Sequence, residues 1–476
     1  MKIEKSKINK IIISCISIFL CCAIIIVSVL FGIGVIPKTT KFTMGNDIQS
    51  IDLSVSSDNV PDDLKYLYEY TVVDDSANYL AHPDSVLLKD MSLLQVYPTE
   101  HGRGAINSKI SYDGGLTYNG KIENQPESWV DSQETPTIYR LEFTDGKTSD
   151  ELILISANPD WGDGKTTGGF NCSVSKDEGK TWSEFELFYP KKADGGVVPI
   201  VAMASLTQLK ENGKFVDKWM GFFHDKFFNN YKSILTFTED GNPQWSKPEK
   251  YFTEYKRLEK STNMCEVEVI RSEAGKGDEL CLISRSNTKL SNSLISFSND
   301  EGKTWSKPKE LPGTLNGERY KAEYAPDGRL VIVFRSIVRD KDLVKKYSEY
   351  AGGTPKSWIS NGPVMWVGTY EDLKNGNDGQ YRIKMMHTYF DSQTEPMEAA
   401  HADTGYCGNT VMPDGTFVIS TYGKFDTSKT YTDDKGNNIY KTSIASKRIN
   451  LNDIDKLAKL QSNKWYKLVL FNKLYK

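Results

Sequence analysis

Four copies of one short motif decide the fold of this chain. SKDEGKTW begins at Ser175 and SNDEGKTW at Ser298, with SYDGGLTY at Ser111 and a degenerate copy, TEDGNPQW, at Thr238. The closing aromatic residues of successive copies are 64, 63 and 60 residues apart, and such a regular spacing predicts a repeat protein. We expect Asp and Gly to close a tight turn, the hydroxyl groups to bond its backbone, and the aromatic ring to pack under a neighbouring strand. The motif is therefore expected to stabilise the fold and not to catalyse a reaction.

The stretches between the copies read as short β-strands, rich in β-branched or aromatic residues and bounded by Gly, Asp, Asn or Pro. A repeat of this length with four short strands is typical of one blade of a β-propeller. The chain from residue 79 to its end has room for about six such blades. We therefore predict an all-β, six-bladed propeller over residues 77–476, preceded by a stalk over 38–76 that includes, as one option, a strand closing the ring. The expected strands are 151–157, 233–238, 279–286, 294–298, 329–336 and 416–423.

The N-terminal segment is expected to lie outside this fold. No charged residue occurs between Lys10 and Lys38, a stretch longer than the ~20 residues that cross a bilayer. Four lysines precede it, so the positive-inside rule puts a tail of residues 1–10 in the cytoplasm and the propeller outside the cell. We predict one transmembrane signal-anchor helix over 11–37 in a single-pass cell-membrane protein. The alternatives are a cleaved signal peptide, which gives a secreted protein, and a buried helix.

Composition excludes several classes of function. The formal net charge is −4, so no basic excess is available for a nucleic-acid partner. Four cysteines lie outside the apolar segment, too few for a disulfide scaffold, and no CxxC or HExxH spacing predicts a metal site. We expect no metal and no cofactor. Only 11 of the 59 basic residues are arginines, so a clustering of arginines is informative.

The four motifs resemble the Asp-boxes of bacterial neuraminidase repeats, and the predicted ring resembles the six-bladed propeller of the sialidase superfamily, from about residue 79 to the end. Two further segments are similar to sialidase motifs. In CEVEVIRSEAGKGDELCLISRSN a glutamate starts one strand and an arginine ends the next, which gives Glu266 and Arg285. DTGYCGNTVMPDGTFVISTYG resembles the segment with the nucleophilic tyrosine, which falls on Tyr406. The alternatives are a surface strand residue for Glu266 and a core aromatic for Tyr406.

The repeat register also predicts which residues face the central funnel. In a blade the start of the innermost strand and the end of the second strand meet on one face of the ring. Arginines at such positions suit an anionic, polyhydroxylated ligand, because the guanidinium fork matches a carboxylate. The alternative is that they form salt bridges that only hold loops. The expected substrate-binding residues are Arg285, Arg335, Arg103, Arg319 and Asp84.

The sequence departs from the family pattern at several positions. The arginine of the family's R-I-P motif has no counterpart in Ala81-His82-Pro83-Asp84, where only the proline remains. The third family arginine is missing from GPVMWVGTY, so Arg103, Arg319 or Arg335 would have to replace these donors. The acid/base aspartate has no clear match, and among Asp84, Glu100 and Glu134 we prefer Glu134 because it precedes an inner strand.

The resemblance implies an exo-α-sialidase-like glycoside hydrolase that removes terminal sialic acid from glycoconjugates. A sialic acid carries a carboxylate on its anomeric carbon, which would repel a carboxylate nucleophile, so retaining sialidases use a tyrosine. A phenol with a reference pKa near ~10 needs a base, and Glu266 would remove the proton of Tyr406. The alternatives are a propeller glycosidase or lyase for another acidic sugar and a non-catalytic carbohydrate-binding propeller.

Overall fold

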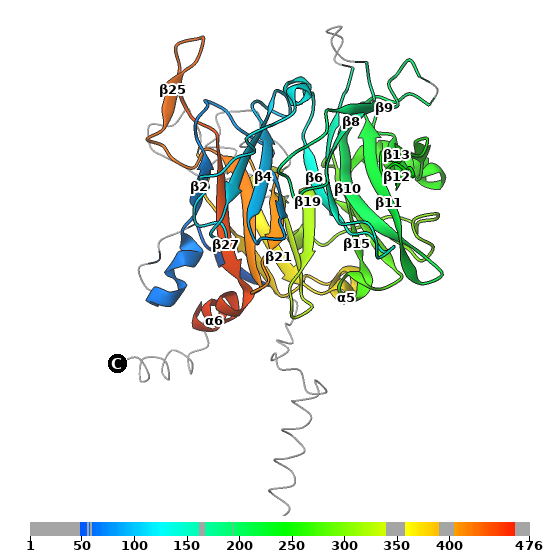
Figure 1. Cartoon of the computed structure of the whole chain (residues 1–476). Helices are drawn as coiled ribbons and strands as arrows, with labels where there is room; N and C mark the ends of the chain where they lie inside the picture. The colour runs from blue at the N-terminus through cyan, green and yellow to red at the C-terminus, as the bar shows by residue number, and fades with distance from the viewer. Residues whose placement is uncertain are drawn as a thin grey trace, which may run out of the picture. The chain divides into compact units, whose positions relative to one another are not determined.

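Six sheets arranged around one axis form the described part of the chain, as the repeat predicts (Figure 1). In each of these six sheets consecutive strands pair antiparallel from the inner strand outward, so each of the six is one blade; β25 and β26 form a separate two-stranded sheet. The architecture is thus the expected all-β, six-bladed propeller. In this computed structural model the described residues are 48–461 except 55–56, 58–59, 161–166, 194, 339–357 and 390–403.

The first three blades follow one another along the chain. Each begins with its innermost strand and continues outward. Blade 1 has three strands, and in blade 3 the short β14 also pairs with β12. The strands are β3 (Asp84–Leu87), β4 (Leu93–Pro98) and β5 (Ile106–Ser111) in blade 1; β6 (Thr137–Leu141), β7 (Glu151–Ala157), β8 (Phe170–Ser175) and β9 (Glu186–Phe188) in blade 2; and β10 (Pro199–Glu211), β11 (Lys214–Asp225), β12 (Asn230–Phe237), β13 (Pro243–Trp245) and β14 (Glu249–Lys250) in blade 3.

The other three blades complete the ring, and two of them take in strands from the N-terminal part of the chain. Their strands are β15 (Met264–Arg271), β16 (Leu280–Ser286), β17 (Leu294–Ser298) and β18 (Lys309–Glu310) in blade 4; β19 (Gly317–Tyr324), β20 (Leu330–Val338), β21 (Ile359–Gly368), β22 (Tyr381–Lys384) and β1 (Gln49–Asp52) in blade 5; and β23 (Gly408–Val411), β24 (Thr416–Gly423), β27 (Ser443–Asn450) and β2 (Thr71–Asp74) in blade 6.

Short helices and one hairpin connect the blades. The helices are η1 (Asp62–Tyr68), η2 (Glu127–Asp131), η3 (Thr253–Tyr255), α2 (Lys256–Thr262), α3 (Ser272–Gly275), η4 (Gly313–Leu315), α5 (Tyr370–Asn375) and α6 (Leu451–Gln461). The hairpin of β25 (Thr430–Thr432) and β26 (Asn438–Tyr440) projects between β24 and β27.

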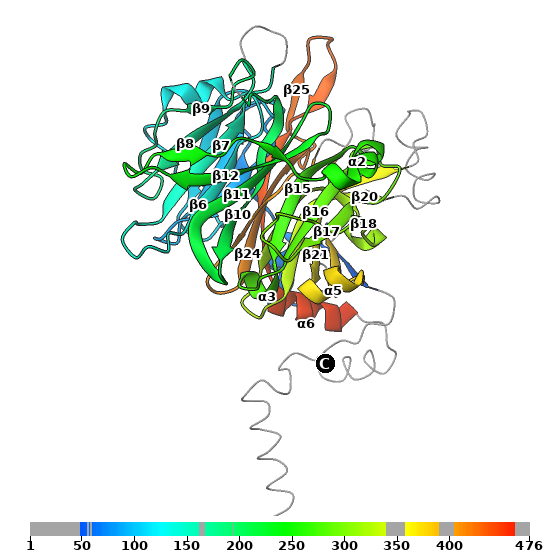
Figure 2. The same cartoon turned by 90° about the vertical axis from the view of Figure 1, so that its right-hand side faces the viewer.

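The inner strands β3, β6, β10, β15, β19 and β23 pack side by side, and β23 contacts β3, which closes the ring. The β25–β26 hairpin and α6 lie on opposite sides of the ring in both views (Figures 1 and 2). The hairpin follows the end of β24, which pairs with the start of β23. The inner strands therefore begin on the hairpin side, and we call this side the hairpin face.

The repeated motif is the predicted structural staple. In the copy at Ser175, the Ser175 hydroxyl donates to Asp177 Oδ1 at 2.9 Å and accepts from the Gly179 amide at 2.8 Å. Thr181 donates its amide and its hydroxyl to the same carboxylate at 2.8 and 2.6 Å. The copies at Ser111 and Ser298 repeat these bonds. Each turn follows the third strand of its blade, so it lies on the face opposite the hairpin face.

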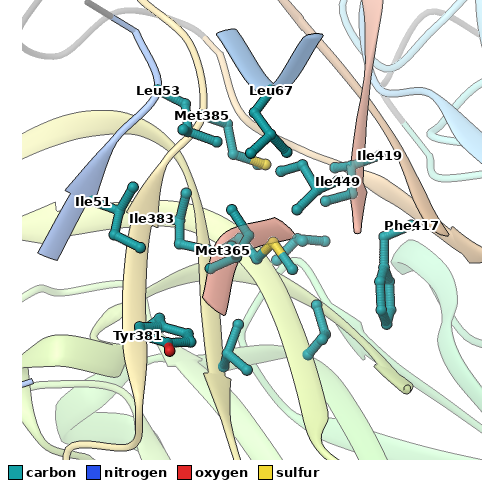
Figure 3. Packing of buried hydrophobic residues seen from close by; sticks show 14 of the residues in the cluster. Ile51, Leu53, Leu67, Met365, Tyr381, Ile383, Met385, Phe417, Ile419 and Ile449 are labelled. Carbon is teal, nitrogen blue, oxygen red and sulfur yellow. The ribbon is translucent and has the colours of Figure 1, made fainter. Parts of the chain in front are cut away.

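The stalk expected over residues 38–76 is, in its described part, a piece of the propeller. β1 pairs parallel with β22 at the edge of blade 5, and β2 pairs with β27 at the edge of blade 6. Apolar residues hold the segment in place: Ile51, Leu53 and Leu67 are at most 2% exposed and pack beside Ile383 and Ile449 (Figure 3). The described fold therefore begins near residue 48 and not at 77, and β2 is the predicted strand that closes the ring.

No helix within the described residues is both long and apolar enough to cross a membrane. The predicted signal-anchor over 11–37 and the tail over 1–10 lie outside the described residues.

Candidate active site

Three predicted residues from two blades meet on the hairpin face. Tyr406 lies just before β23, Glu266 near the start of β15, and Arg285 near the end of β16. The Tyr406 hydroxyl donates to Glu266 Oε1 at 2.8 Å. Arg285 Nη1 donates to both carboxylate oxygens of Glu266, at 2.9 and 2.8 Å, and to the Tyr406 hydroxyl at 2.8 Å. A phenol, a carboxylate and a guanidinium thus share one set of hydrogen bonds.

A break in the β15–β16 ladder places Glu266 in this group. The register between the two strands shifts between Cys265 and Glu268, and Glu266 has a φ of 47°. A non-glycine residue with positive φ is strained by about 1–3 kcal/mol. Bulges of this kind re-aim a side chain and are frequent next to active sites. The strain at Glu266 therefore serves to point its carboxylate at Tyr406.

A second carboxylate, Glu318 at the start of β19, gathers three cations beside the first. Glu318 Oε1 lies 3.0 Å from Arg285 Nη2 and 2.8 Å from Lys289 Nζ. Arg335 donates its Nε to Glu318 Oε2 at 2.7 Å, and its Nη2 lies 2.5 Å from the same oxygen. We call Tyr406, Glu266, Arg285, Glu318, Lys289 and Arg335 the Tyr406 cluster.

Two further groups lie against the Tyr406 ring. The His82 imidazole stacks on it with centroids 4.6 Å apart, and the Arg335 guanidinium lies 4.8 Å from the ring centroid. His82 is fixed by the Thr135 hydroxyl and the Tyr422 hydroxyl, each 3.2 Å from one of its ring nitrogens. These contacts hold the phenol in one orientation.

The charges in the cluster set opposite protonation states for its two central groups. Burial alone would raise the pKa of Glu266, but the Arg285 guanidinium outweighs it and lowers the pKa to about 2. Burial and the charge of Glu266 raise the pKa of Tyr406 above its usual value, although Arg285 and Arg335 oppose this. Near neutral pH Glu266 is therefore ionised and accepts a hydrogen bond from the protonated phenol of Tyr406. This is the ground state required of a base and a nucleophile.

Comparisons with known proteins agree with the propeller and its repeats. Residues 124–352 match the model of the BNR repeat-like domain. This match covers just under half of the chain and agrees with the Asp-box repeats of the six-bladed propeller. No curated protein matches the chain.

Solved structures similar to this BNR propeller share its fold at low sequence identity. The NanB sialidase from Streptococcus pneumoniae is 12% identical with a TM-score of 0.50, over 81% of this chain and 71% of the other. A mutant α-L-arabinofuranosidase from Fusarium graminearum, in complex with an iminosugar inhibitor, is 12% identical with a TM-score of 0.51, over 81% of this chain and 98% of the other. Such identities establish the fold only, because one propeller architecture carries many activities.

Glu134, the preferred acid, lies beside this cluster in the BNR propeller. It precedes β6, is 8% exposed, and accepts from the amide and hydroxyl of Thr135 at 3.0 and 2.9 Å. Burial raises the pKa of Glu134, and the negative charge of Glu266 raises it further. Gly102 covers it, since a Cβ there would lie 2.7 Å from Glu134 Oε1 and 3.6 Å from His82 Nδ1. Glu134 is thus a carboxyl group biased toward its protonated form.

Of the predicted substrate-binding residues, Arg285 and Arg335 belong to the Tyr406 cluster, and the other three do not. Arg103 lies on an exposed turn between β4 and β5. Arg319 is 3% exposed and donates to the Ala204 carbonyl at 3.3 Å. Burial raises the pKa of Glu268 to about 7 and the Arg319 charge opposes this rise, while at Glu266 Arg319 adds to the lowering of the pKa by Arg285; Arg319 thus lies between the two carboxylates.

Asp84 was expected on the funnel, but its carboxylate faces the other way along the axis. It accepts from the Ile138 amide and lies 3.1 Å from Lys321 Nζ. Asp84 and Lys321 line a cavity of about 470 Å³ to which all six inner strands contribute residues. The lysine and the amide attract the carboxylate down the axis, which the strand register alone does not indicate.

The sequence interpretation missed Glu318 and Lys289. The register offers a signal for Glu318. Cys265 pairs with Arg285 in blade 4, and Glu318 pairs with Arg335 in blade 5, so both second strands end in an arginine opposite the start of an inner strand. A comparison of the two strand pairs would have placed Glu318 beside both arginines. Lys289 lies in the loop after β16 and carries no such signal.

Proposed function

We propose that this BNR propeller is a retaining glycoside hydrolase of the exo-α-sialidase type, with Tyr406 as nucleophile and Glu266 as its base. The observation that carries the proposal is the 2.8 Å hydrogen bond between the Tyr406 hydroxyl and Glu266, made at the start of the inner strands. The distance lies within the reach required of a nucleophile and its general base.

In the first step the Tyr406 oxygen attacks the anomeric carbon while its proton passes to Glu266. The bond from that carbon to the leaving oxygen breaks, and Glu134 supplies the proton that the leaving oxygen takes. The raised pKa of Glu134 suits this role, since an acid must hold its proton at the working pH. In the second step Glu134 removes a proton from water, which attacks the glycosyl-tyrosine and releases the sugar. Glu266 then returns its proton to the phenolate oxygen of Tyr406.

Arg285 has a further role in the first step. Its Nη1 already donates to the Tyr406 hydroxyl at 2.8 Å. As the phenol loses its proton, negative charge grows on that oxygen, and a charged donor in place stabilises it without reorganisation. The same guanidinium holds Glu266 ionised, so Arg285 contacts both partners of the proton transfer.

The charge of the cluster supports an anionic substituent on the sugar. Arg285, Arg335 and Lys289 face two carboxylates, Glu266 and Glu318. One positive charge is left over when both carboxylates are ionised, which matches the single carboxylate of a sialic acid. A tyrosine nucleophile also suits an acidic sugar, because a carboxylate nucleophile would be repelled by the substrate carboxylate on the anomeric carbon.

A neutral terminal sugar, such as an arabinofuranosyl unit, is the second candidate, and Glu318 favours it. This carboxylate occupies the cations that a substrate carboxylate would need. A neutral sugar would not repel Glu266, so that ionised carboxylate would itself attack the anomeric carbon, with Tyr406 as its hydrogen-bond donor. The arabinofuranosidase with a similar fold is compatible with this candidate.

Trapping of the covalent intermediate separates the two candidates. The full chain is incubated with fluorinated sialosyl and arabinofuranosyl fluorides and then digested for mass spectrometry. A sialosyl adduct on Tyr406 supports the sialidase proposal, and an arabinosyl adduct on Glu266 supports the second candidate. Binding of sialyl-lactose without release of lactose, and with no adduct from either reagent, would refute both in favour of a carbohydrate-binding protein.

We propose further that the enzyme acts at the outer surface of a cell membrane on sialylated glycoproteins or glycolipids. The support is the uncharged segment 11–37 after four lysines, which suits a signal-anchor with the propeller outside. Cleavage of that segment would release the same enzyme in soluble form. Fractionation of cells that express the full chain, with and without residues 1–37, tests the anchor.

A further inference from the structure

Three potential metal ligands lie together on the inner side of the Tyr406 cluster. His224 is the last residue but one of β11, next to Asp225, and Cys265 and Glu266 are neighbours in β15. One nitrogen, the sulfur and one carboxylate oxygen of these residues all lie within 4.8 Å of one another. In a tetrahedral zinc site the donor atoms are roughly 3.5 Å apart, so a small inward rotation of the three side chains is enough.

The hydrogen bond of His224 leaves a lone pair for a metal. His224 Nδ1 lies 3.0 Å from the carbonyl oxygen of Asp225, and only an N–H satisfies a carbonyl oxygen. The neutral ring therefore keeps its lone pair on Nε2. This arrangement, a backbone carbonyl on one ring nitrogen and a free lone pair on the other, is how proteins orient histidine ligands of metals.

Within the described residues, His224 Nε2 is buried and has no hydrogen-bond partner, and the side chain is only 4% exposed. A buried polar atom without a partner costs about 1–3 kcal/mol, so its presence calls for an explanation. Cys265 is 1% exposed and a free thiol. Glu266 accepts three hydrogen bonds, and a carboxylate has about four acceptor positions, so one remains.

The three donors select a particular class of metal. Thiolate, imidazole and carboxylate together are ligands of Zn²⁺ and of the chemically similar Cd²⁺, whereas Ca²⁺ and Mg²⁺ require oxygen donors. The Cys265 thiolate and the Glu266 carboxylate together supply two negative charges, which equal the charge of a divalent metal. Three protein ligands leave a fourth position for water, as in open zinc sites.

We propose that His224, Cys265 and Glu266 form a binding site for a thiophilic divalent cation of the zinc class, and that its occupation inhibits the enzyme. On binding, the Cys265 S–H bond breaks, its proton leaves to solvent, and a sulfur–metal bond forms. The metal draws electron density from Glu266, which then no longer takes the proton of Tyr406. The inhibitory half of this inference rests on the proposed function, and the binding half does not.

Cadmium binding tests the site without any assay of activity. Cd²⁺ bound to a thiolate gives an ultraviolet charge-transfer absorbance, and we expect the full chain to show it with one ion per protein at that site. Cys265→Ala should remove this absorbance. Cys281→Ala is the matched control, because Cys281 is an equally buried free thiol of the same blade, and it should keep the absorbance.

His224→Gln provides a second variant in case Cys265→Ala does not fold, as judged by circular dichroism. It keeps a polar side chain and should weaken cadmium binding at least tenfold. Absence of the absorbance in the wild-type chain, or an absorbance unchanged in folded Cys265→Ala or His224→Gln, overturns the inference.

Inhibition is then measured on whichever sugar the enzyme hydrolyses. Loss of a general base costs about 10²- to 10⁴-fold, so saturating Zn²⁺ should lower kcat at least 100-fold in the wild-type chain and in Cys281→Ala. Ca²⁺ and Mg²⁺ at equal concentration should have no effect. Cys265→Ala, compared with its own metal-free rate, should lose most of the zinc sensitivity. Zinc inhibition that persists in this variant overturns the regulatory role, whereas a chain that binds cadmium as predicted but hydrolyses no sugar refutes only the proposed function.

Discussion

Replacing Tyr406 with phenylalanine removes one oxygen atom and separates catalysis from folding. That oxygen donates to Glu266 and accepts from Arg285, each at 2.8 Å. Glu266 and Arg285 remain bonded to each other in its absence, so no buried charge is left unpaired. At about 0.5–1.5 kcal/mol for each of these two hydrogen bonds, the free energy of unfolding should fall by only about 1–3 kcal/mol. The fold and the sugar site should survive the change.

The expected effect on turnover is much larger. Deleting a nucleophile typically lowers kcat by about 10⁴-fold or more, which corresponds to at least about 5.5 kcal/mol of transition-state stabilisation. The assay is hydrolysis of a 4-methylumbelliferyl α-sialoside, with calorimetric binding of a sialic-acid inhibitor on the same preparation. Binding should stay within a few-fold of the wild-type chain while kcat is lost.

Tyr320→Phe is the control for the loss of a buried phenol. Tyr320 is 1% exposed, and its hydroxyl donates to the Leu315 carbonyl at 3.1 Å. This variant should cost similar stability with less than a tenfold change in kcat. If Tyr406→Phe keeps kcat within tenfold of the wild-type chain, Tyr406 is not the nucleophile. An intermediate loss of 10- to 100-fold would favour Glu266 as the attacking group, with the phenol as its donor.

Four further changes test separate parts of the argument. Arg285→Ala should weaken a carboxylated inhibitor by about 2–5 kcal/mol by calorimetry, the cost of truncating a desolvated charge pair, and equal affinity would place Arg285 outside the substrate site. Glu134 is active when protonated, so kcat/KM should fall as the pH rises through its raised pKa. Glu134→Gln should abolish this fall in kcat/KM, and a fall that persists in the variant would mean that another group titrates. Lys447 is 1% exposed, and burial lowers its pKa to about 7, whereas a lysine in the unfolded chain has a pKa of about 10.4. Between these two pH values the unfolded chain binds more protons than the folded one, so the free energy of unfolding should rise with pH. Lys447→Met should stabilise the fold by about 2 kcal/mol at pH 7 in urea unfolding and remove this rise, and an unchanged slope would contradict a buried neutral amine. Deletion of 1–37 should leave a soluble, active propeller, and loss of fold in circular dichroism would show that the segment is structural.

The blades could be predicted because their determinants are local. Each Asp-box folds through hydrogen bonds within eight residues, as in the segment from Ser175 to Thr181. Its sequence therefore predicts the turn without any knowledge of the rest of the chain. The edge strands β1 and β2 have no such signal. They are four residues each and form only by pairing with β22 and β27, more than 300 residues away. Their membership of the propeller depends on long-range packing, and the sequence therefore suggested a stalk.

The site was predictable to the level of the blade but not of the side chain. Glu266 and Glu268 are two residues apart, and a regular strand would point both to one face. The bulge between them sends Glu266 to the Tyr406 cluster and Glu268 to the axial cavity near Asp84. Nothing in the sequence marks the bulge, because the residue with positive φ is a glutamate and not a glycine. A similar break in β19 follows Glu318, where Arg319 has a φ of 53°.

Glu318 is the residue on which the choice of substrate depends. Blades 4 and 5 place a residue at the start of the inner strand opposite an arginine at the end of the second strand, and this residue is Cys265 in one and Glu318 in the other. With a neutral residue in both positions, the two arginines would form a strongly cationic site that binds any carboxylate. Glu318 removes one unit of that charge and fixes both guanidinium groups in place, so fewer donors remain and their geometry is set in advance. An anionic substrate then gains less binding energy from charge and depends more on how well its carboxylate fits the donors that remain.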